Sequence, residues 1–182
     1  MKELSLTLLD IAKNSVKAEA SLIDISLVLG EDGWLTMTIK DDGCGMSEAV
    51  LAHVTDPFYT TRTTRKVGLG LPFLKLAAEQ TGGALTLSSS NEAGKSGTVL
   101  CATFDTKSID CMPMGDIVST VCALVSGSPE TDFCFADVSP AGRVELDTRE
   151  LRAVLGDGIS LAEPEVVMWM KEYLEEQYQN RE

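Results

Sequence analysis

Residues 34–46 have the sequence Trp34-Leu-Thr-Met-Thr-Ile-Lys-Asp41-Asp42-Gly43-Cys44-Gly45-Met46. After Trp34, residues 35–40 alternate apolar and polar side chains, which predicts a half-buried β-strand over 34–40. Asp41 ends that strand with a carboxylate, and Gly43 and Gly45 follow where the backbone can turn tightly and lie close to a neighbouring group. Because Asp-Asp-Gly is also a common turn sequence, its interpretation depends on the rest of the chain.

The segments around this stretch predict the fold. Residues 21–29 also alternate, and Gly30-Glu-Asp-Gly33 separates them from the strand at 34–40, which predicts an antiparallel hairpin. Residues 3–19 place their apolar side chains along one side of a helix. The pattern continues with helices at 47–53 and 68–81, a mobile polar loop at 54–67, and strands at 84–90 and 98–104. This order predicts a two-layer α/β sandwich with helices on one face of a sheet.

Three further motifs flank the Asp41 turn. They are Asp10-Ile-Ala-Lys-Asn14-Ser-Val-Lys17, Asp56-Pro-Phe58-Tyr59-Thr60-Thr61-Arg62 and Gly68-Leu69-Gly70-Leu71. Together with the Asp41 turn they resemble the N, G1, F and G2 boxes of the GHKL superfamily, which includes histidine kinases and gyrase-type topoisomerases. The resemblance extends from about Leu4 to Phe104. It implies the Bergerat fold, a two-layer α/β sandwich with a pocket for ATP and Mg²⁺.

The resemblance assigns roles to the N and G1 boxes. Asp41 would accept a hydrogen bond from the adenine amino group, while Gly43 and Gly45 let the backbone pass close beneath the base. Asn14 would ligate Mg²⁺ through its carboxamide oxygen, a hard ligand of the kind this ion prefers; the alternative is a solvated helix residue. Asp10 lies one turn before Asn14 on the same face. In hydrolysing members this position is a glutamate that activates water, so Asp10 is the expected catalytic base, although its side chain is shorter.

The F and G2 boxes would form the lid and the phosphate site. Thr61 and Arg62 would lie near the phosphates. Gly68 and Gly70 would present backbone N–H groups at a helix N-terminus, where an anion is favoured.

Two lysines are expected to contact the phosphates, Lys17 after the N box and Lys66 before the G2 box. A solvent-facing lysine is the alternative for each of them. The remaining residues of the expected ATP site are Met46, Phe58, Tyr59, Thr60, Leu69, Leu71 and Thr98.

Residues 106–182 are not covered by the resemblance and differ in charge. Residues 1–105 carry 9 Lys+Arg against 13 Asp+Glu, a net −4, whereas residues 106–182 carry 6 against 15, a net −9, which together make the total of −13. Helices are expected at 116–125, 148–155 and 163–177, and a hairpin at 132–147. The sequence therefore predicts an ATP-binding domain at 1–105 and a small acidic α+β appendage at 106–182. Its charge is more typical of a solvated surface than of a docking site.

The resemblance leaves several functions open. It extends to anti-sigma-factor serine kinases and to the catalytic half of a histidine kinase, so bound ATP would be hydrolysed slowly or transferred to a partner protein. The non-enzymatic alternative is an ATP-gated regulatory module whose extension reports the state of the lid to a partner. The other interpretation of the extension is that it packs against the sheet or completes a homodimer. Because His53 is the only histidine and does not resemble a phosphoacceptor, the acceptor is expected on another protein.

Composition narrows the expected partners and location. Binding of nucleic acid is not expected, because phosphate neutralisation needs a basic face. The residues after Met1 do not resemble a secretory signal, and no apolar stretch is long enough to cross a membrane. The five cysteines show no CxxC spacing, so no cysteine metal site is indicated. We expect a soluble cytoplasmic protein whose partners are ATP and another protein, without a membrane partner.

Overall fold

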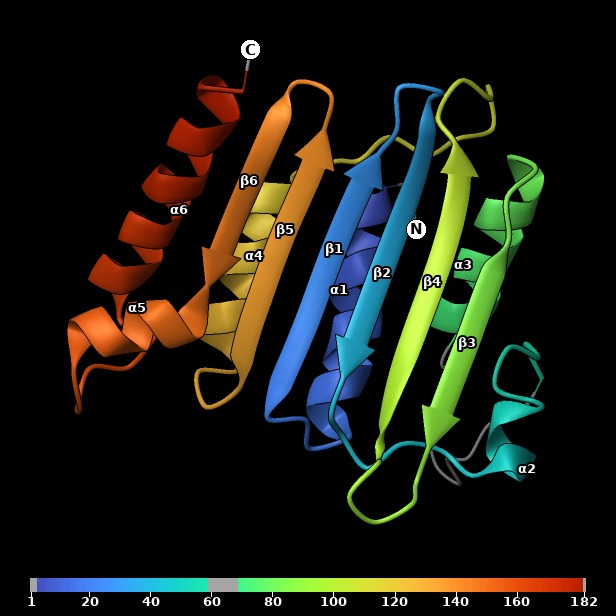
Figure 1. Ribbon diagram of the computed structural model, residues 1–182, viewed down its shortest axis with the longest axis horizontal. Coiled ribbons are helices and arrows are strands. Elements are labelled where there is room, and N and C mark those ends of the chain that lie inside the picture. The colour runs from blue at the N-terminus through green and yellow to red at the C-terminus, as the bar shows by residue number, and fades with distance from the viewer. Residues whose placement is uncertain (1–2, 59–68, 182) are drawn as a thin grey trace.

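The computed structural model describes residues 3–58 and 69–181, which form one six-stranded sheet flanked by helices (Figure 1). In the order of the sheet, the strands are β3 (Leu85–Ser90), β4 (Gly97–Asp105), β2 (Trp34–Asp41), β1 (Leu22–Leu29), β5 (Asp132–Ser139) and β6 (Gly142–Asp147). All neighbours pair antiparallel except β1 and β5, which are parallel. The predicted α/β sandwich is confirmed.

Helices on one face of the sheet form the second layer. Within the described residues the helices of the chain are α1 (Leu4–Lys17), α2 (Glu48–Leu51), α3 (Gly70–Gln80), α4 (Ile117–Gly127), α5 (Thr148–Leu155) and α6 (Pro164–Gln179). Figure 1 shows α1, α3 and α4 behind the sheet, where α1 packs against both α3 and α4. The helix predicted at 47–53 is shorter than expected, because α2 begins after its cap Ser47 and ends at Leu51. The mobile loop predicted at 54–67 lies largely outside the described residues.

The buried face of the sheet follows from the alternation along its strands. On β1, Ile23, Ile25 and Leu27 are at most 2% exposed, whereas the residues between them are half-buried or exposed. The same alternation continues on β2, β4 and β6. From the helical side, α1 contributes a buried stripe that includes Leu8 and Ile11. The core therefore lies between the sheet and α1, α3 and α4, and no described helix covers the middle of the opposite face (Figure 1).

The residues after 106 continue the same sheet. β5 pairs with β1 along its length, with Ile25 opposite Phe135. The connecting segment also reaches the start of α1, where the backbone N–H groups of Leu4 and Ser5 donate to the carbonyl oxygens of Pro113 and Met114 at 3.0 and 2.8 Å. These are N–H groups of a first helical turn, which have no acceptor within their own helix. Buried residues from both sides of residue 106 belong to one hydrophobic core. The division into domains at 1–105 and 106–182 stays a prediction.

The helix α6 covers the outer edge of the sheet. The backbone N–H of Glu145 on β6 donates to Oε1 of Gln177, and Nε2 of Gln177 donates back to the Glu145 carbonyl, each at 2.9 Å. The side-chain amide thus occupies the hydrogen-bonding groups that an additional strand would use. No helix in the described part of the chain is both long enough and apolar enough to span a bilayer.

Candidate functional site

The carboxylate of Asp41 is the most strongly positioned polar group of the predicted site. It stands at the end of β2 on the core side and is 9% exposed. The hydroxyl of Ser15 on α1 donates to its Oδ2 at 2.5 Å, and the backbone N–H of Gly43 donates to its Oδ1 at 3.0 Å. Both oxygens therefore have a fixed partner, and each keeps a lone pair for one further donor.

The neighbouring carboxylate of Asp42 has a different environment. It is exposed, and its Oδ1 accepts the backbone N–H groups of Ser21 and Leu22 at 2.7 and 2.9 Å. Asp42 thereby fastens the turn to the start of β1. Of the two adjacent aspartates, only Asp41 lies where β2 meets the helical layer.

Two glycines bring the backbone around Asp41 into close contact. Gly45 has φ +68°, and a Cβ there would lie 1.7 Å from the Ser90 carbonyl oxygen. Gly97 has φ +144°, and a Cβ there would lie 2.3 Å from the Asp41 carbonyl oxygen. A side chain at either position would clash with backbone, so the close packing of the turn against β3 and β4 requires glycine.

Hydrogen bonds connect the Asp41 turn to the end of the β3–β4 hairpin. The N–H of Met46 donates to the hydroxyl of Ser89 at 2.8 Å, and this hydroxyl lies 2.8 Å from Oγ1 of Thr98. Thr98 is the register partner of Asp41. The structure thus brings together Asp41, Gly43, Gly45, Met46 and Thr98, all of which the sequence analysis placed in the site.

The α1 helix presents the other predicted residues on its exposed side. Asp10, Asn14 and Lys17 are all exposed and recur at intervals of four and three residues, so they share one face. Within residues 3–58 and 69–181, none of their side chains forms a hydrogen bond or ion pair. Two oxygen-bearing side chains, Asp10 and Asn14, are therefore available on the helix that also holds Asp41 through Ser15.

The start of α3 lies against this face of α1. Gly70 is the first residue of α3, and a Cβ there would lie 3.4 Å from Cδ1 of Ile11 and 3.9 Å from Cβ of Asp10. Gly70 and Leu71 belong to the first helical turn, whose N–H groups have no acceptor within the helix. Leu69 precedes them, and its side chain makes no cap hydrogen bond. These N–H groups, which donate to no other described residue, lie near Asp10, an arrangement suited to an anion.

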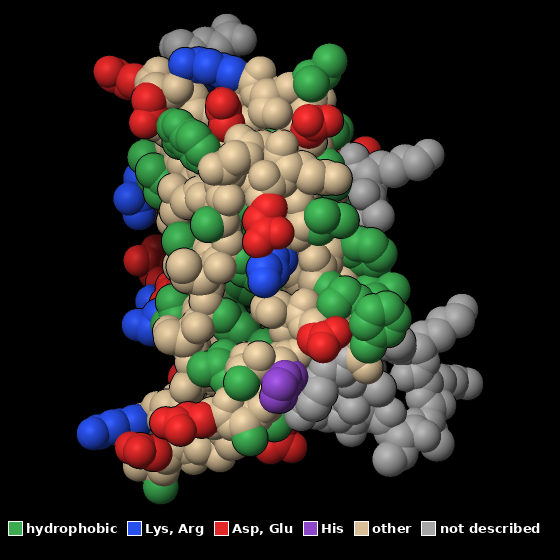
Figure 2. All heavy atoms as spheres, turned by 90° about the vertical axis from the view of Figure 1, so that its right-hand side faces the viewer, with side chains coloured by type: hydrophobic (Ala, Val, Ile, Leu, Met, Phe, Trp, Pro, Cys, Tyr) green, Lys and Arg blue, Asp and Glu red, His purple; other side chains and the backbone are tan. Residues whose placement is uncertain are grey.

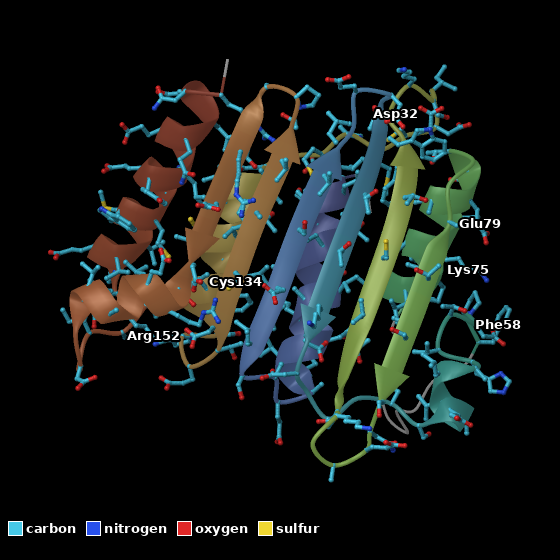
Figure 3. All side chains as sticks on the ribbon, viewed as in Figure 1. Asp32, Phe58, Lys75, Glu79, Cys134 and Arg152 are labelled. Atoms are coloured by element: carbon cyan, nitrogen blue, oxygen red, sulfur yellow. The ribbon has the colours of Figure 1, made fainter. Side chains whose placement is uncertain are left out.

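The predicted lid can be followed only as far as Phe58. Phe58 is 93% exposed, and Figure 3 shows it beside α2, directed away from the sheet. Its N–H donates to Oδ1 of Asp56 at 2.9 Å. The other predicted lid and phosphate residues lie outside the described residues: Tyr59, Thr60, Thr61, Arg62, Lys66 and Gly68.

Three residues that contribute to the site were not predicted from the sequence: Ser15, Ser89 and Gly97. Ser15 gave a signal, because it is a hydroxyl on the buried side of α1, as Ser5 and Thr7 are, and a buried hydroxyl requires a partner. Ser89 and Gly97 gave none, since their roles depend on the pairing of β3 with β4.

Comparisons with known proteins agree with this arrangement. The sequence model of the family described as histidine kinase-, DNA gyrase B-, and HSP90-like ATPase matches residues 2–108. A stretch of 61 residues is 43% identical to the C4-dicarboxylate transport sensor protein DctB of Pseudomonas aeruginosa, and it spans 33% of this chain but 10% of that protein.

Two solved structures are similar to the chain as a whole or in part. The N-terminal domain of a DNA repair protein superposes with a TM-score of 0.61 over 87% of this chain and 58% of that chain, at 14% identity. The mycobacterial sensor histidine kinase MprB superposes with a TM-score of 0.43 over 54% of this chain and 68% of that chain, at 22% identity. The first superposition covers more of the chain than residues 2–108, so the similarity in fold includes part of the extension.

Proposed function

We propose that this chain, which belongs to the family of histidine kinase-, DNA gyrase B- and HSP90-like ATPases, binds Mg·ATP between α1, the turn at 41–46 and the N-terminus of α3. The observation that carries the proposal is the Asp41 carboxylate, which Ser15 and Gly43 hold in one orientation at the end of β2. A buried acceptor that is fixed in this way can select the adenine amino group. Guanine offers an oxygen at the same ring position, which would face the carboxylate without a hydrogen.

The proposed pocket assigns the phosphates to the exposed face of α1 that carries Asp10, Asn14 and Lys17. Asn14 and Asp10 supply hard oxygens suited to Mg²⁺ and its water ligands, and bound Mg²⁺ would neutralise charge on the triphosphate. The N-terminus of α3 at Gly70 would receive phosphate oxygens, and Lys17 would add a positive charge from the same face of α1. The lid residues Thr61, Arg62, Lys66 and Gly68 are proposed to complete the phosphate site.

Titration calorimetry with Asp41→Asn tests the proposal. The amide places an N–H₂ group or a neutral oxygen where the adenine amino group needs an anionic acceptor, so we expect ATP binding to weaken by about 1–3 kcal/mol. Asp42→Asn is the matched control, because Asp42 is exposed and fastens only the start of β1. Equal affinity of the wild type and Asp41→Asn for ATP would refute the assignment.

The fate of the bound nucleotide is a second part of the proposal. We propose that ATP is hydrolysed slowly or that its γ-phosphate is transferred to a partner protein, with Asp10 as the base that accepts the proton of water or of the acceptor hydroxyl. In a radiolabelled-phosphate assay, Asp10→Asn should lose activity while retaining ATP binding. Unchanged activity would remove Asp10 from the mechanism.

A non-catalytic, ATP-gated module is the alternative function. It is favoured by the backbone hydrogen bonds between the start of α1 and Pro113–Met114, because they tie the helix with Asp10 and Asn14 directly to the extension. Tight ATP binding by a wild-type protein that neither hydrolyses ATP nor transfers phosphate would support this alternative.

The proposed partner is a protein rather than a nucleic acid. Seen from the β3 side, acidic and basic side chains are interspersed and do not form a continuous basic surface (Figure 2). The extension carries a net charge of −9 from 6 Lys+Arg and 15 Asp+Glu, which would repel a phosphate backbone.

A further inference from the structure

The α6 helix has an aromatic surface that the proposed nucleotide site does not use. Its buried stripe consists of Val166, Met170 and Leu174. On another side, Trp169 and Tyr173 are 46% and 37% exposed and stack on each other, with ring centroids 4.9 Å apart and an interplanar angle of 11°. Large aromatic rings that remain exposed next to each other are typical of an interaction surface.

Tyr173 also forms one wall of a hollow on the face of the sheet opposite α1 and α4. The hollow has a volume of about 310 Å³, and its floor comes from β1, β5 and β6. Glu150 of α5 lines it as well. Figure 3 shows Cys134 of β5 on this open face, with α5 nearby. The aromatic pair and the hollow are therefore continuous through Tyr173, and we call them together the α6 surface.

The charges of the α6 surface are not balanced. In the hollow, Arg143 pairs with Glu145 at 2.6 Å, and Asp147 pairs with Arg149 at 2.7 Å. Two more carboxylates line the hollow, those of Asp24 and Glu150. Neither forms an ion pair with a described residue, although the positive charge of Arg149 is close enough to Asp24 to interact with it. Along α6, the exposed carboxylates of Glu165, Glu172 and Glu176 form no ion pair with a described residue. Lys171 pairs with Glu175 at 3.8 Å.

We propose that the α6 surface binds a basic segment of a partner protein and that an arginine of this segment occupies the hollow. The planar guanidinium can stack on the flat ring of Tyr173 and donate hydrogen bonds to carboxylates in the same plane. Asp24 and Glu150 supply these carboxylates, and Trp169 extends the aromatic wall for the neighbouring residues of the segment.

Two observations define how the segment docks. It cannot pair with β6 as an additional strand, because Gln177 already occupies the backbone groups of Glu145. A second copy of this chain is a less suitable occupant, because two surfaces of the same negative charge repel each other, and each chain carries −13. Side-chain recognition of a foreign, positively charged segment is the mode that fits.

Intrinsic fluorescence can report on this surface. Trp34 and Trp169 are the only two tryptophans of the chain, so Trp34→Phe leaves Trp169 as the single emitter. The probes are three amphipathic peptides in which leucine alternates with arginine, lysine or glutamate. We expect the arginine peptide to change the Trp169 emission at the lowest concentration, the lysine peptide to bind more weakly, and the glutamate peptide not to bind.

Variants separate this surface from general charge attraction. Tyr173→Ala and Glu150→Lys should each weaken binding of the arginine peptide roughly tenfold, and Tyr173→Phe should retain it because the ring is kept. Glu92→Lys is the matched control: it makes the same charge change in the β3–β4 turn, at the other edge of the sheet, and should alter affinity by less than about twofold. Equal affinities for all variants, equal losses in Glu92→Lys and Glu150→Lys, or no binding up to about 1 mM peptide would each overturn the proposal.

Discussion

The helices α1 and α6 are built alike on their buried sides and differently on their exposed sides. Leu8 of α1 and Met170 of α6 are both 0% exposed. The exposed side of α1 carries Asp10, Asn14 and Lys17, whereas that of α6 carries the stacked pair Trp169 and Tyr173. Hydrophobic periodicity shows which side of a helix is buried, but the use of the exposed side depends on residue types that periodicity does not include.

The two helices also differ in position. α1 lies between α3 and α4 in the helical layer and contacts the sheet over β1 and β2. α6 packs against β6 at the edge and against α4. A substitution of a buried residue of α1 therefore affects the centre of the core. A substitution of a buried residue of α6 affects the edge, and it tests whether the extension unfolds together with the centre.

The largest expected effect comes from truncating these buried stripes. Leu8→Ala and Met170→Ala should each lower the free energy of unfolding by about 2–5 kcal/mol, because each removes a fully buried side chain and leaves a cavity. Urea unfolding followed by circular dichroism measures both. If the core behaves as one unit, both variants keep a single transition; a separate early transition in Met170→Ala alone would show that the extension unfolds independently.

A smaller effect is expected at the turn that the sequence motif identifies. Gly45→Ala should destabilise the fold by about 1–3 kcal/mol, because φ is +68° and the new Cβ would overlap the Ser90 carbonyl. Gly82→Ala is the control, since its φ is +82° but no atom lies within 4 Å of a Cβ there. Thermal unfolding of both variants separates backbone conformation from the clash. Similar losses in the two would indicate that the turn can move away from β3.

The two halves of the chain were predictable from the sequence to different degrees. Secondary structure was predicted well in both, because alternation and amphipathic spacing are local properties, and Thr148–Leu155 was predicted at the bounds that α5 has. The parallel pairing of β5 with β1 was not predicted, because strand order depends on contacts between distant segments. The same holds for Ser89, whose role depends on the pairing of β3 with β4.

The candidate site shows the same limit. The spacing of the motifs located Asp41, Gly43 and Gly45, which the structure places together. The partner of Asp41, Ser15, required the fold, because only the packing of α1 against the end of β2 brings the two side chains together. The aromatic pair on α6 was not predicted, because amphipathic spacing identifies the buried side of a helix and carries no information on how its exposed side is used.

The smallest expected effect concerns an ion pair of the extension, in contrast to the unpaired charges on α1. The side-chain hydrogen bond from Arg149 is the main reason that the pKa of Asp147 is lowered to about 2. A lowered pKa stabilises the folded state above the ordinary value of 3.8, and this contribution is lost as the pH falls from there through about 2. Arg149→Gln should raise the pKa of Asp147 towards its ordinary value, although the backbone N–H of residue 149 would still donate to it.

Urea unfolding at a series of pH values measures the effect on stability. The wild type should be more stable than Arg149→Gln at pH 7, and the difference in the free energy of unfolding should shrink as the pH falls through about 2. An NMR titration of the Asp147 carboxyl provides the direct readout, and the same pKa in both proteins would show that the N-terminus of α5, and not Arg149, determines it.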